Sequence, residues 1–415
     1  MSRIFSSSYL IVTFGFAFRA LSLSILIVLL ARALGPSDFG GYAAAASLAS
    51  FFSMFSGLGA GPLHVRDVAQ AKLPYAISLN RTMRLVGWSM IPLAAAAMIC
   101  AWFLIPHNVD AAAVLLIVLG ETLYYAGADL AMRILQARER YAAMTLAICS
   151  TPAARVTIAV VMMETGALSL LSWAFVSVAT GALLALCVFV WWGWQMRDVL
   201  GRELPLFHDS LAGLGFAVST AASRVHGDAD KVILARLAST ATTGTYTLAY
   251  RLTDVFLLPI SAGVERVFPI LFRRGQHGLR HSLHASGWAI VFTLAFATVL
   301  SLGLYATASL LPWILGGDYL QTVPIAHALA AVPFSTTCWI ILRTLAATSG
   351  HEKSAGVAEL VGGIFNVAVT IALVLPWGWK GAVAATYLTH AVMVGSFAFY
   401  LVWRSGPSLL LRRSN

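Results

Sequence analysis

The sequence predicts an all-α integral membrane protein with about twelve transmembrane helices in two pseudo-symmetric six-helix bundles around a central cavity. Three observations support this fold class: the composition, the length of the apolar runs and an internal repeat. Hydrophobic residues make up 59% of the 415 residues, charged residues make up 11%, and the mean hydropathy is +0.82. A soluble domain could not bury so much apolar surface, so we place the chain in a lipid bilayer.

Apolar runs of about 20 residues, the length of helix that crosses a hydrocarbon core of about 30 Å, follow one another along the chain. The first run follows Arg3, is longer than the core of a signal peptide and has no small-residue cleavage site at its end, so we expect it to be retained. We place the spans at residues 9–31, 42–62, 85–105, 111–131, 142–163, 168–192, 211–235, 243–270, 286–311, 320–342, 355–376 and 381–403.

An internal duplication with an offset of 204 residues divides the chain into two similar halves. Ala31–Arg32, Gly40, Tyr42, Ala45, Leu48 and Phe52 recur as Ala235–Arg236, Gly244, Tyr246, Ala249, Leu252 and Phe256. A repeat of this length determines the architecture before local propensity does. It predicts one six-helix bundle in residues 1–200 and a second in residues 201–415.

The basic residues predict the orientation of the chain in the membrane. Most of them fall in the even-numbered loops and at the C-terminus, where the list is Arg66, Lys72, Arg81, Arg84, Arg133, Arg138, Arg140, Arg197, Arg202, Arg273, Arg274, Arg280, Arg343, Lys353, Arg404, Arg412 and Arg413. By the positive-inside rule both termini face the cytoplasm. The net charge of +10 is therefore mostly a signal of topology, and it indicates no nucleic-acid partner.

The seventh span, residues 211–235, contains enough charge that hydropathy alone would miss it. The repeat aligns it with the first span, which is plainly apolar, and an odd number of spans would put the C-terminal arginines on the wrong side. Arg224, Asp228 and Lys231 recur at intervals of four and three residues and so share one helix face, whereas Asp230 points elsewhere. We expect this face to line a polar interior, because charges inside membranes generally mark a substrate or ion path.

Two arginines occupy comparable depths in the two halves. Arg19 lies thirteen residues before Arg32, and Arg224 lies twelve before Arg236, which places both about 18–20 Å from the outer helix ends. A guanidinium in a membrane cavity suits an anion and binds phosphate oxygens through two parallel hydrogen bonds. We therefore expect Arg19 and Arg224 to contact a phosphate-bearing substrate, with Asp228 orienting Arg224.

Other charges inside the spans are weaker candidates. Arg251 is a further candidate for substrate binding, although it lies three residues from Asp254 and is expected to pair with it. Carboxylates in a cavity can hold a coupling cation or carry a proton. The candidates for ion coupling, to a proton or a sodium gradient, are Glu121, Asp129, Asp230 and Lys231.

Motifs of catalysis, metal binding and cofactor binding are absent from the sequence. It has no Walker loop, no HExxH pair and no nucleotide-binding domain. Cys100, Cys149, Cys187 and Cys338 lie in apolar runs without disulfide or metal spacing. We therefore expect a transporter with no catalytic residue, metal or cofactor.

Two segments carry a resemblance to a known family. They are "LLARALGPSDFGGYAAAASLASFFSMFSGLGAGPLHVRDVAQ", from Leu29 to Gln70, and "DADKVILARLASTATTGTYTLAYRL", from Asp228 to Leu252. The first resembles the opening of the Wzx-type polysaccharide flippases of the multidrug/oligosaccharidyl-lipid/polysaccharide exporter superfamily. The second resembles their junction of the seventh and eighth helices, where Asp230 matches an acidic position and Arg251 the arginine of helix eight. It departs from the first copy of the repeat, because Ser239–Thr240 replaces the Gly-Pro pair.

The resemblance implies a flippase that translocates a polyprenyl-pyrophosphate-linked oligosaccharide from the cytoplasmic to the outer leaflet by alternating access. It implies a multi-pass protein of the inner (cytoplasmic) membrane that acts in the biosynthesis of cell-surface polysaccharide, such as lipopolysaccharide or exopolysaccharide. Its partners would be the lipid-linked oligosaccharide and membrane lipids, with a polysaccharide polymerase or chain-length machinery as protein partners.

Three other functions are compared with this one. A cation-coupled multidrug exporter of the same superfamily should favour acidic cavity walls, whereas arginine here at least equals carboxylate among the deep residues. A polytopic membrane enzyme of polysaccharide assembly should carry a long catalytic outer loop, and the longest outer loops here are about a dozen residues. A non-transporting scaffold would have little use for paired deep arginines.

Overall fold

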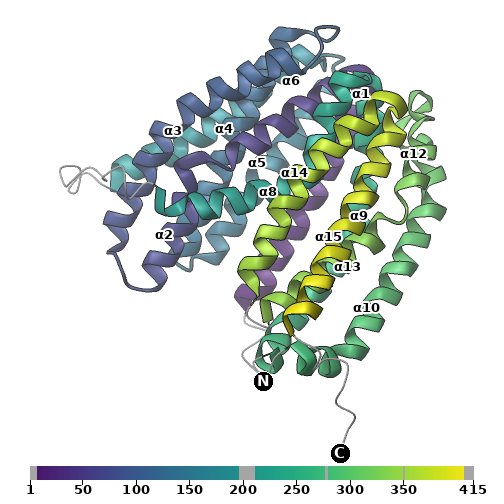
Figure 1. Cartoon of the computed structure of the whole chain (residues 1–415). Coiled ribbons are helices and arrows are strands. Elements are labelled where there is room, and N and C mark those ends of the chain that lie inside the picture. Colours follow the sequence, from purple (N-terminus) through teal and green to yellow (C-terminus); the bar gives the residue numbers. More distant parts are fainter. Residues whose placement is uncertain (1–6, 196–210, 276–278, 349–350, 406–415) are drawn as a thin grey trace, which may run out of the picture. The chain divides into compact units, whose positions relative to one another are not determined.

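A computed structural model describes residues 7–195, 211–275, 279–348 and 351–405. Within these ranges the regular structure is helical and no strand occurs (Figure 1). The chain divides into two compact units, Met1–Arg224 with Ser239–Gly244, and Val225–Ala238 with Thr245–Asn415. The predicted junction of the halves at residues 200 and 201 lies outside the described residues, as do Arg3, Arg197, Arg202, Arg412 and Arg413.

The first and second spans join without a loop in α1 (Ser7–Ser53). Gly35 has φ 73° and ψ 172°, far from helical values, and Pro36 follows it. Proline is well tolerated in the first turn of a helix, and glycine adopts positive φ without a Cβ clash. The Gly-Pro pair therefore ends one helix and begins the next within two residues.

The prediction of a regular second span to residue 62 is wrong at its end. The helix stops at Ser53, a 3₁₀ turn η1 follows (Ser56–Gly59), and a new helix α2 begins (Ala60–Ala69). Gly57, Leu58 and Gly59 have φ of 62°, 52° and 79°, and three such residues in a row cannot continue a right-handed helix.

The rest of the first unit is built around α4 (Ala111–Ala137). It contacts α3 (Tyr75–Leu104), α5 (Tyr141–Glu164) and most extensively α6 (Leu170–Gln195). Two glycines allow the backbones of α4 and α6 to touch, because a Cβ on Gly181 would lie 2.3 Å from the Gly120 carbonyl oxygen. An apolar cluster shared by α3, α4 and α6 contains Leu79, Met83, Val86, Leu130, Ile134 and Val188. The short turn η2 (Leu211–Gly213) packs against η1.

The second unit takes most of α8 (Leu214–Leu237) and α9 (Thr240–Gly275), and all the helices that follow. These are α10 (Leu279–Thr307), η3 (Ala308–Leu310), α11 (Leu311–Leu315), η4 (Gly317–Tyr319), α12 (Thr322–Leu329), α13 (Val332–Thr348), α14 (Glu352–Trp377) and α15 (Trp379–Ser405). The predicted tenth span is broken between α12 and α13, because Pro333 has no N–H to continue the helical hydrogen bonds.

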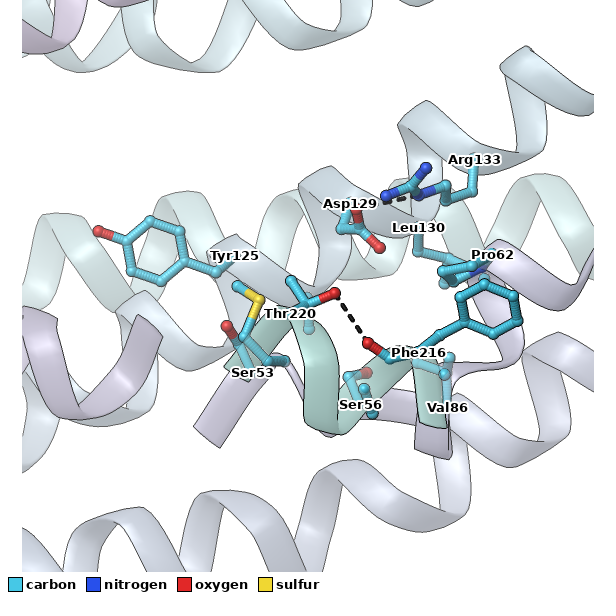
Figure 2. Close-up of a pocket in the computed structure, with 15 residues that line it drawn as sticks. Ser53, Ser56, Pro62, Val86, Tyr125, Asp129, Leu130, Arg133, Phe216 and Thr220 are labelled. Carbon is cyan, nitrogen blue, oxygen red and sulfur yellow. Dashed lines mark hydrogen bonds and ion pairs between the residues drawn. The ribbon is translucent and has the colours of Figure 1, made fainter. Parts of the chain in front are cut away.

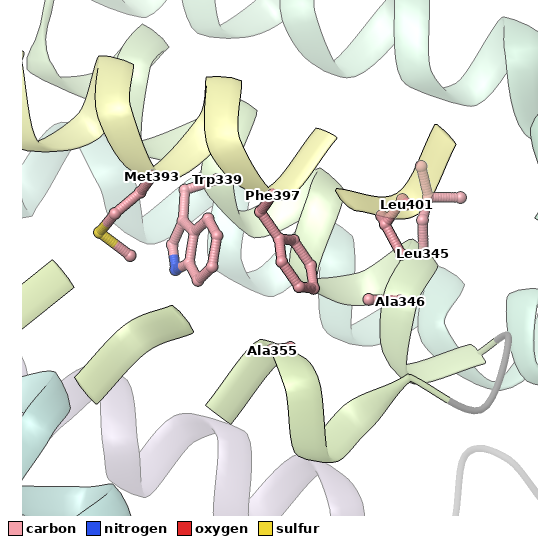
Figure 3. Close-up of a cluster of buried hydrophobic side chains, with 7 residues drawn as sticks. All are labelled: Trp339, Leu345, Ala346, Ala355, Met393, Phe397 and Leu401. Atoms are coloured by element: carbon pink, nitrogen blue, oxygen red, sulfur yellow. The ribbon is translucent and has the colours of Figure 1, made fainter. Parts of the chain in front are cut away.

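The core of the second unit joins α13, α14 and α15 (Figure 3). Trp339 of α13 packs edge-on against Phe397 of α15, with ring centroids 5.7 Å apart. Around them lie Leu345, Ala346, Ala355, Met393 and Leu401. Because these helices span the membrane, burial of such side chains removes apolar surface from lipid and not from water, so close packing of the side chains holds the helices together.

Nine of the described helices are long and apolar enough to cross a membrane, and the segment Ile11–Ser53 has length for two spans. Neither α8 nor α9 is among the nine. The sequence predicted this outcome for the seventh span, which is too charged to be recognised by hydropathy. With α1 counted twice and α8 and α9 added, the described helices match the twelve predicted spans.

Candidate functional site

Arg19 lies in the apolar first half of α1, where α1 packs closely on α5. Gly15 makes the approach possible, because a Cβ there would lie 2.4 Å from Thr145 Cγ2. The Cys149 thiol donates to the Gly15 carbonyl oxygen at 3.3 Å. One turn further along the same face, the half-buried Arg19 is close enough to Tyr124 of α4 to interact with it electrostatically. The first unit thus carries a cation inside a membrane span.

Glu121 and Arg155 form a buried ion pair between α4 and α5. Both side chains are 1% exposed, and Arg155 Nη1 lies 2.9 Å from Glu121 Oε1 and 3.0 Å from Oε2. The Arg155 Cζ lies 4.0 Å from the centroid of the Tyr124 ring.

Residues of α6 complete this network. Arg155 Nε donates to Thr180 Oγ1 at 2.9 Å, and the Ser177 hydroxyl donates to Glu121 Oε1 at 3.2 Å. The pair is therefore surrounded by hydrogen-bond partners, as a charge pair must be to persist in an apolar interior. Glu121, which the sequence marked for ion coupling, is held between α5 and α6.

A small pocket lies where the broken end of the second span faces α4 and the start of α8 (Figure 2). Asp129 and Arg133 approach it from α4 and form an ion pair in which Nε donates to Oδ1 at 3.3 Å. Its volume is about 50 Å³, enough for a few water molecules or one small ion but not for a glycolipid. The polar side chains lining it include Ser53, Ser56, Tyr125, Asp129, Arg133 and Thr220.

The irregular backbone around Gly57 and Gly59 forms one wall of this pocket. Gly57 N donates to Ser89 Oγ at 2.7 Å, which provides the partner that a helix would otherwise supply. Gly59 touches η2, since a Cβ on Gly59 would lie 2.1 Å from the Gly213 carbonyl oxygen. Membrane proteins tolerate unwound backbone where it is buried in protein or lines a polar cavity. The sequence showed these glycines but could not distinguish close packing from a hinge.

The charges of α8 in the second unit lie in two sets of side-chain contacts, which the Lys231 backbone N–H joins by donating to Asp230 Oδ1 at 2.8 Å. Lys231 Nζ donates to Asp228 Oδ1 at 2.6 Å and also to the Gly227 carbonyl oxygen. Asp230 is 2% exposed and accepts a hydrogen bond from the Tyr246 hydroxyl at 2.7 Å. The spacing predicted a shared face for Asp228 and Lys231 and a different direction for Asp230, and the contacts agree.

The other two predicted substrate contacts lie at exposed positions. Arg224 of α8 is exposed. Arg251 of α9 forms an ion pair with Asp254 at 3.1 Å, with the two side chains 45% and 43% exposed. The pairing of Arg251 agrees with its three-residue spacing from Asp254. The hypothesis that Asp228 orients Arg224 stays a prediction, since the Asp228 carboxylate is paired with Lys231.

Sequence reasoning missed several partners of these charges. Nothing in the spacing indicated that the Tyr246 hydroxyl binds Asp230, although Tyr246 is a member of the repeat. Arg343 was assigned to a loop, yet its Nη1 lies 3.2 Å from Glu359 Oε1 and links α13 to α14. Pairs between helices distant in sequence have no local pattern to reveal them.

Comparison with known proteins identifies the family to which the chain belongs. A family model described as "Polysaccharide biosynthesis protein" matches residues 6–274, well over half of the chain. The chain belongs to this family. The match confirms the resemblance seen in the sequence, and it covers the whole first repeat, α8 and almost all of α9. No curated protein matches the chain.

Solved structures similar to this family member confirm its fold class. A multidrug resistance MATE family transporter of the MOP superfamily, in an inward-facing conformation, has a TM-score of 0.76 at 12% identity and covers 95% of this chain and 96% of its own. The lipid II flippase MurJ, in an inward closed conformation, has a TM-score of 0.73 at 13% identity, with 94% and 87% covered. The MATE multidrug transporter DinF-BH has a TM-score of 0.60 at 14% identity, with 98% and 96% covered.

The chain is therefore a multi-pass membrane protein of the polysaccharide biosynthesis family, with a fold similar to that of a MATE family transporter and of the lipid II flippase MurJ. These solved structures are of a transporter and a flippase, proteins that move molecules and do not catalyse a chemical reaction.

Proposed function

We propose that this family member translocates a polyprenyl-pyrophosphate-linked oligosaccharide from the cytoplasmic to the outer leaflet by alternating access, for cell-surface polysaccharide biosynthesis. The observation that carries the proposal is Arg19, a half-buried guanidinium on an otherwise apolar span of a chain in the polysaccharide biosynthesis family. The fold shared with a lipid II flippase supports it. An amphiphile with a pyrophosphate group needs such a cation during its passage through hydrocarbon.

We assign substrate binding to Arg19 and Arg224, with Arg251 and Asp228 in supporting roles. Guanidinium groups stay charged in a cavity and form paired hydrogen bonds with phosphate oxygens. Arg19 is the best-supported substrate contact of the four. The helices around it pack closely, and α1 has no carboxylate near it in sequence that would neutralise its charge. Arg251 already has Asp254 beside it and would have to exchange that partner for the substrate.

We place ion coupling at Asp129, Asp230 and Lys231 ahead of Glu121. Asp129 is at a pocket that can hold a small ion, and its partner Arg133 lies at 3.3 Å, a weak pair that an ion could replace. Asp230 is buried beside the neutral hydroxyl of Tyr246 and two residues from Asp228. Glu121 would have to break a fully buried contact with Arg155 before it could take up an ion. The driving gradient would be of protons or sodium.

The proposed location is the inner membrane with both termini in the cytoplasm. The basic residues of the even-numbered loops support this orientation. A polysaccharide polymerase or chain-length machinery at the outer face would receive the translocated oligosaccharide.

Deletion of the gene tests this function. We expect the lipid-linked oligosaccharide to accumulate on the cytoplasmic leaflet, wild type to restore export, and Arg19→Ala and Arg224→Ala to restore it poorly. Arg19→Lys keeps the charge but loses the fork geometry and should be intermediate. Arg140→Ala, which removes an exposed arginine, is the matched control. No accumulation, together with increased sensitivity to cationic drugs, would favour the multidrug exporter, and full rescue by Arg19→Ala would refute the assigned site.

A further inference from the structure

The first unit has an apolar groove whose lining contains none of the charged residues described above, although its Thr180 accepts the hydrogen bond from Arg155. It lies between α4, α5 and α6 and has a volume of about 520 Å³, within the range of about 300–1,000 Å³ typical of ligand pockets. We call it the lateral groove. It is lined by Ala131, Ile134, Leu135, Ala147, Ser150, Thr151, Ala154, Thr180, Leu183, Leu184, Cys187, Val188 and Trp191.

The lateral groove opens to the side of the unit that faces hydrocarbon. The groove residue Leu183 is 61% exposed, and Leu146 and Val190, which adjoin the groove residues Ala147 and Trp191 in sequence, are 71% and 61% exposed. On membrane-spanning helices such residues contact lipid, and a concave apolar surface among them is filled by hydrocarbon chains and not by water.

A fixed positive charge lies at one end of the groove. The Arg138 Cζ is 4.1 Å from the centroid of the Tyr75 ring and 5.9 Å from that of Trp191, a groove residue. Arg138 Nη2 donates to Gln195 Oε1 at 2.9 Å. Two aromatic rings and one hydrogen bond thus hold the guanidinium in place, and it keeps further N–H donors with which to bind a phosphate.

The depth of the groove matches one leaflet. On α6 the groove residues run from Trp191, beside Arg138, to Thr180, which are eleven residues apart, or about 17 Å at 1.5 Å each. A hydrocarbon core of about 30 Å gives each leaflet about 15 Å. The groove therefore accommodates a chain of leaflet length whose polar end lies at Arg138, and it is too short for a polyprenyl chain that crosses the midplane.

We propose that the lateral groove binds one acyl chain of an anionic phospholipid of the cytoplasmic leaflet, whose phosphate is held by Arg138. None of the assigned substrate contacts, Arg19, Arg224, Asp228 and Arg251, lines the groove, and the proposal does not depend on the proposed cargo. Basic positions at the cytoplasmic ends of transmembrane helices attract anionic headgroups, which favours an anionic over a zwitterionic lipid. Because the site bridges α4, α5 and α6, the lipid would stabilise the first unit.

Native mass spectrometry of the purified full chain tests this site with phosphatidylglycerol, phosphatidylcholine and a polyprenyl phosphate as separate probes. We expect wild type to retain phosphatidylglycerol in preference to phosphatidylcholine. Arg138→Gln should weaken its binding about tenfold, the loss expected for a charge-assisted hydrogen bond. Ala154→Phe should remove binding by filling the groove. Arg140→Gln and Ala143→Phe alter exposed positions outside the groove and should bind as wild type does.

Three results would overturn the proposal. Equal retention of phosphatidylcholine would show that the charge of the headgroup does not matter. Equal effects of Arg138→Gln and Arg140→Gln would show that Arg138 makes no specific contact with the phosphate. Tighter binding of the polyprenyl phosphate, abolished by Ala154→Phe, would assign the groove to a prenyl chain instead.

Discussion

At the scale of single residues, the stability of the first unit depends on the buried ion pair between Glu121 and Arg155. Two opposite charges at 1% exposure are stable only while each holds the other. Glu121→Gln leaves Arg155 buried without a counter-charge, and the expected loss is about 3–5 kcal/mol of unfolding free energy. Thermal unfolding in detergent measures it. Asp254→Asn, which breaks the exposed pair with Arg251, should cost about 0–1 kcal/mol. Equal losses for the two variants would contradict this assignment.

His64 of α2 predicts a pH dependence of stability. It is 1% exposed, it shares a 2.8 Å hydrogen bond between Nδ1 and Ser78 Oγ, and burial lowers its pKa from 6.5 to about 4. Between these two values the unfolded chain binds a proton that the folded chain does not, so stability is complete above pH 6.5 and falls as the pH drops toward 4.

The contribution of His64 is at most about 3 kcal/mol. His64→Asn cannot gain the proton, so its melting temperature should fall less than that of wild type between pH 6.5 and 4. Thermal unfolding of both proteins across this range measures the difference. Parallel curves would show that His64 does not cause the loss.

At the scale of elements, the glycine contact between α4 and α6 sets how closely these two helices pack. A Cβ on Gly120 would lie 2.4 Å from the Ser177 backbone carbon, and one on Gly181 2.3 Å from the Gly120 carbonyl oxygen. Either alanine substitution must push the helices apart and disturb Ser177 and Thr180 beside Arg155. Overpacking of this kind typically costs about 1–3 kcal/mol.

Gly193→Ala is the matched control on the same helix, because a Cβ there meets no atom within 4 Å. It should be neutral or slightly stabilising, since alanine favours the helix by about 1 kcal/mol. The melting temperatures of Gly120→Ala, Gly181→Ala and Gly193→Ala give the comparison. A loss in Gly193→Ala as large as in the other two would mean that propensity, and not packing, decides the outcome.

The elements also show what the sequence could predict. Asp228, Asp230 and Lys231 would remove α8 from any count based on hydropathy, and the match of Ala235–Arg236 to Ala31–Arg32 restores it. The end of the second span could not be predicted, because Leu58 at φ 52° is a residue that ordinarily continues a helix. The turn at residues 57–59 is held by the contacts of Gly57 with Ser89 and of Gly59 with Gly213, and both partners are distant in sequence.

The sequence supplied the candidate residues of the site but not their contacts. Depth and charge type identified Arg19, Glu121, Asp129 and Asp230. The partners Arg155, Ser177 and Tyr246 depend on how whole helices pack, which one sequence does not encode locally. Pairs three or four residues apart on one helix could be predicted from the sequence, because helical geometry alone places Lys231 beside Asp228.

At the scale of the whole molecule, the basic residues predict the orientation of the chain in the membrane, with both termini in the cytoplasm. In a background without native cysteines, Ala167→Cys, in the turn after α5, should react with a membrane-impermeant maleimide added to intact cells. Glu139→Cys, in the turn before α5, should react only after the membrane is permeabilised. Both positions are exposed, so accessibility does not differ between them. The reverse pattern would invert the chain in the membrane.

Transport of the lipid-linked oligosaccharide itself tests the central claim most directly. The protein is reconstituted in liposomes that carry a polyprenyl-pyrophosphate-linked oligosaccharide, and arrival in the opposite leaflet is followed by digestion with an impermeant glycosidase. We predict rapid transfer by wild type and by Arg140→Gln, and a loss of about tenfold or more for Arg19→Gln, the loss expected when a charge-assisted hydrogen bond to the pyrophosphate is removed. Transfer by wild type no faster than in protein-free liposomes, or undiminished transfer by Arg19→Gln, would contradict the account.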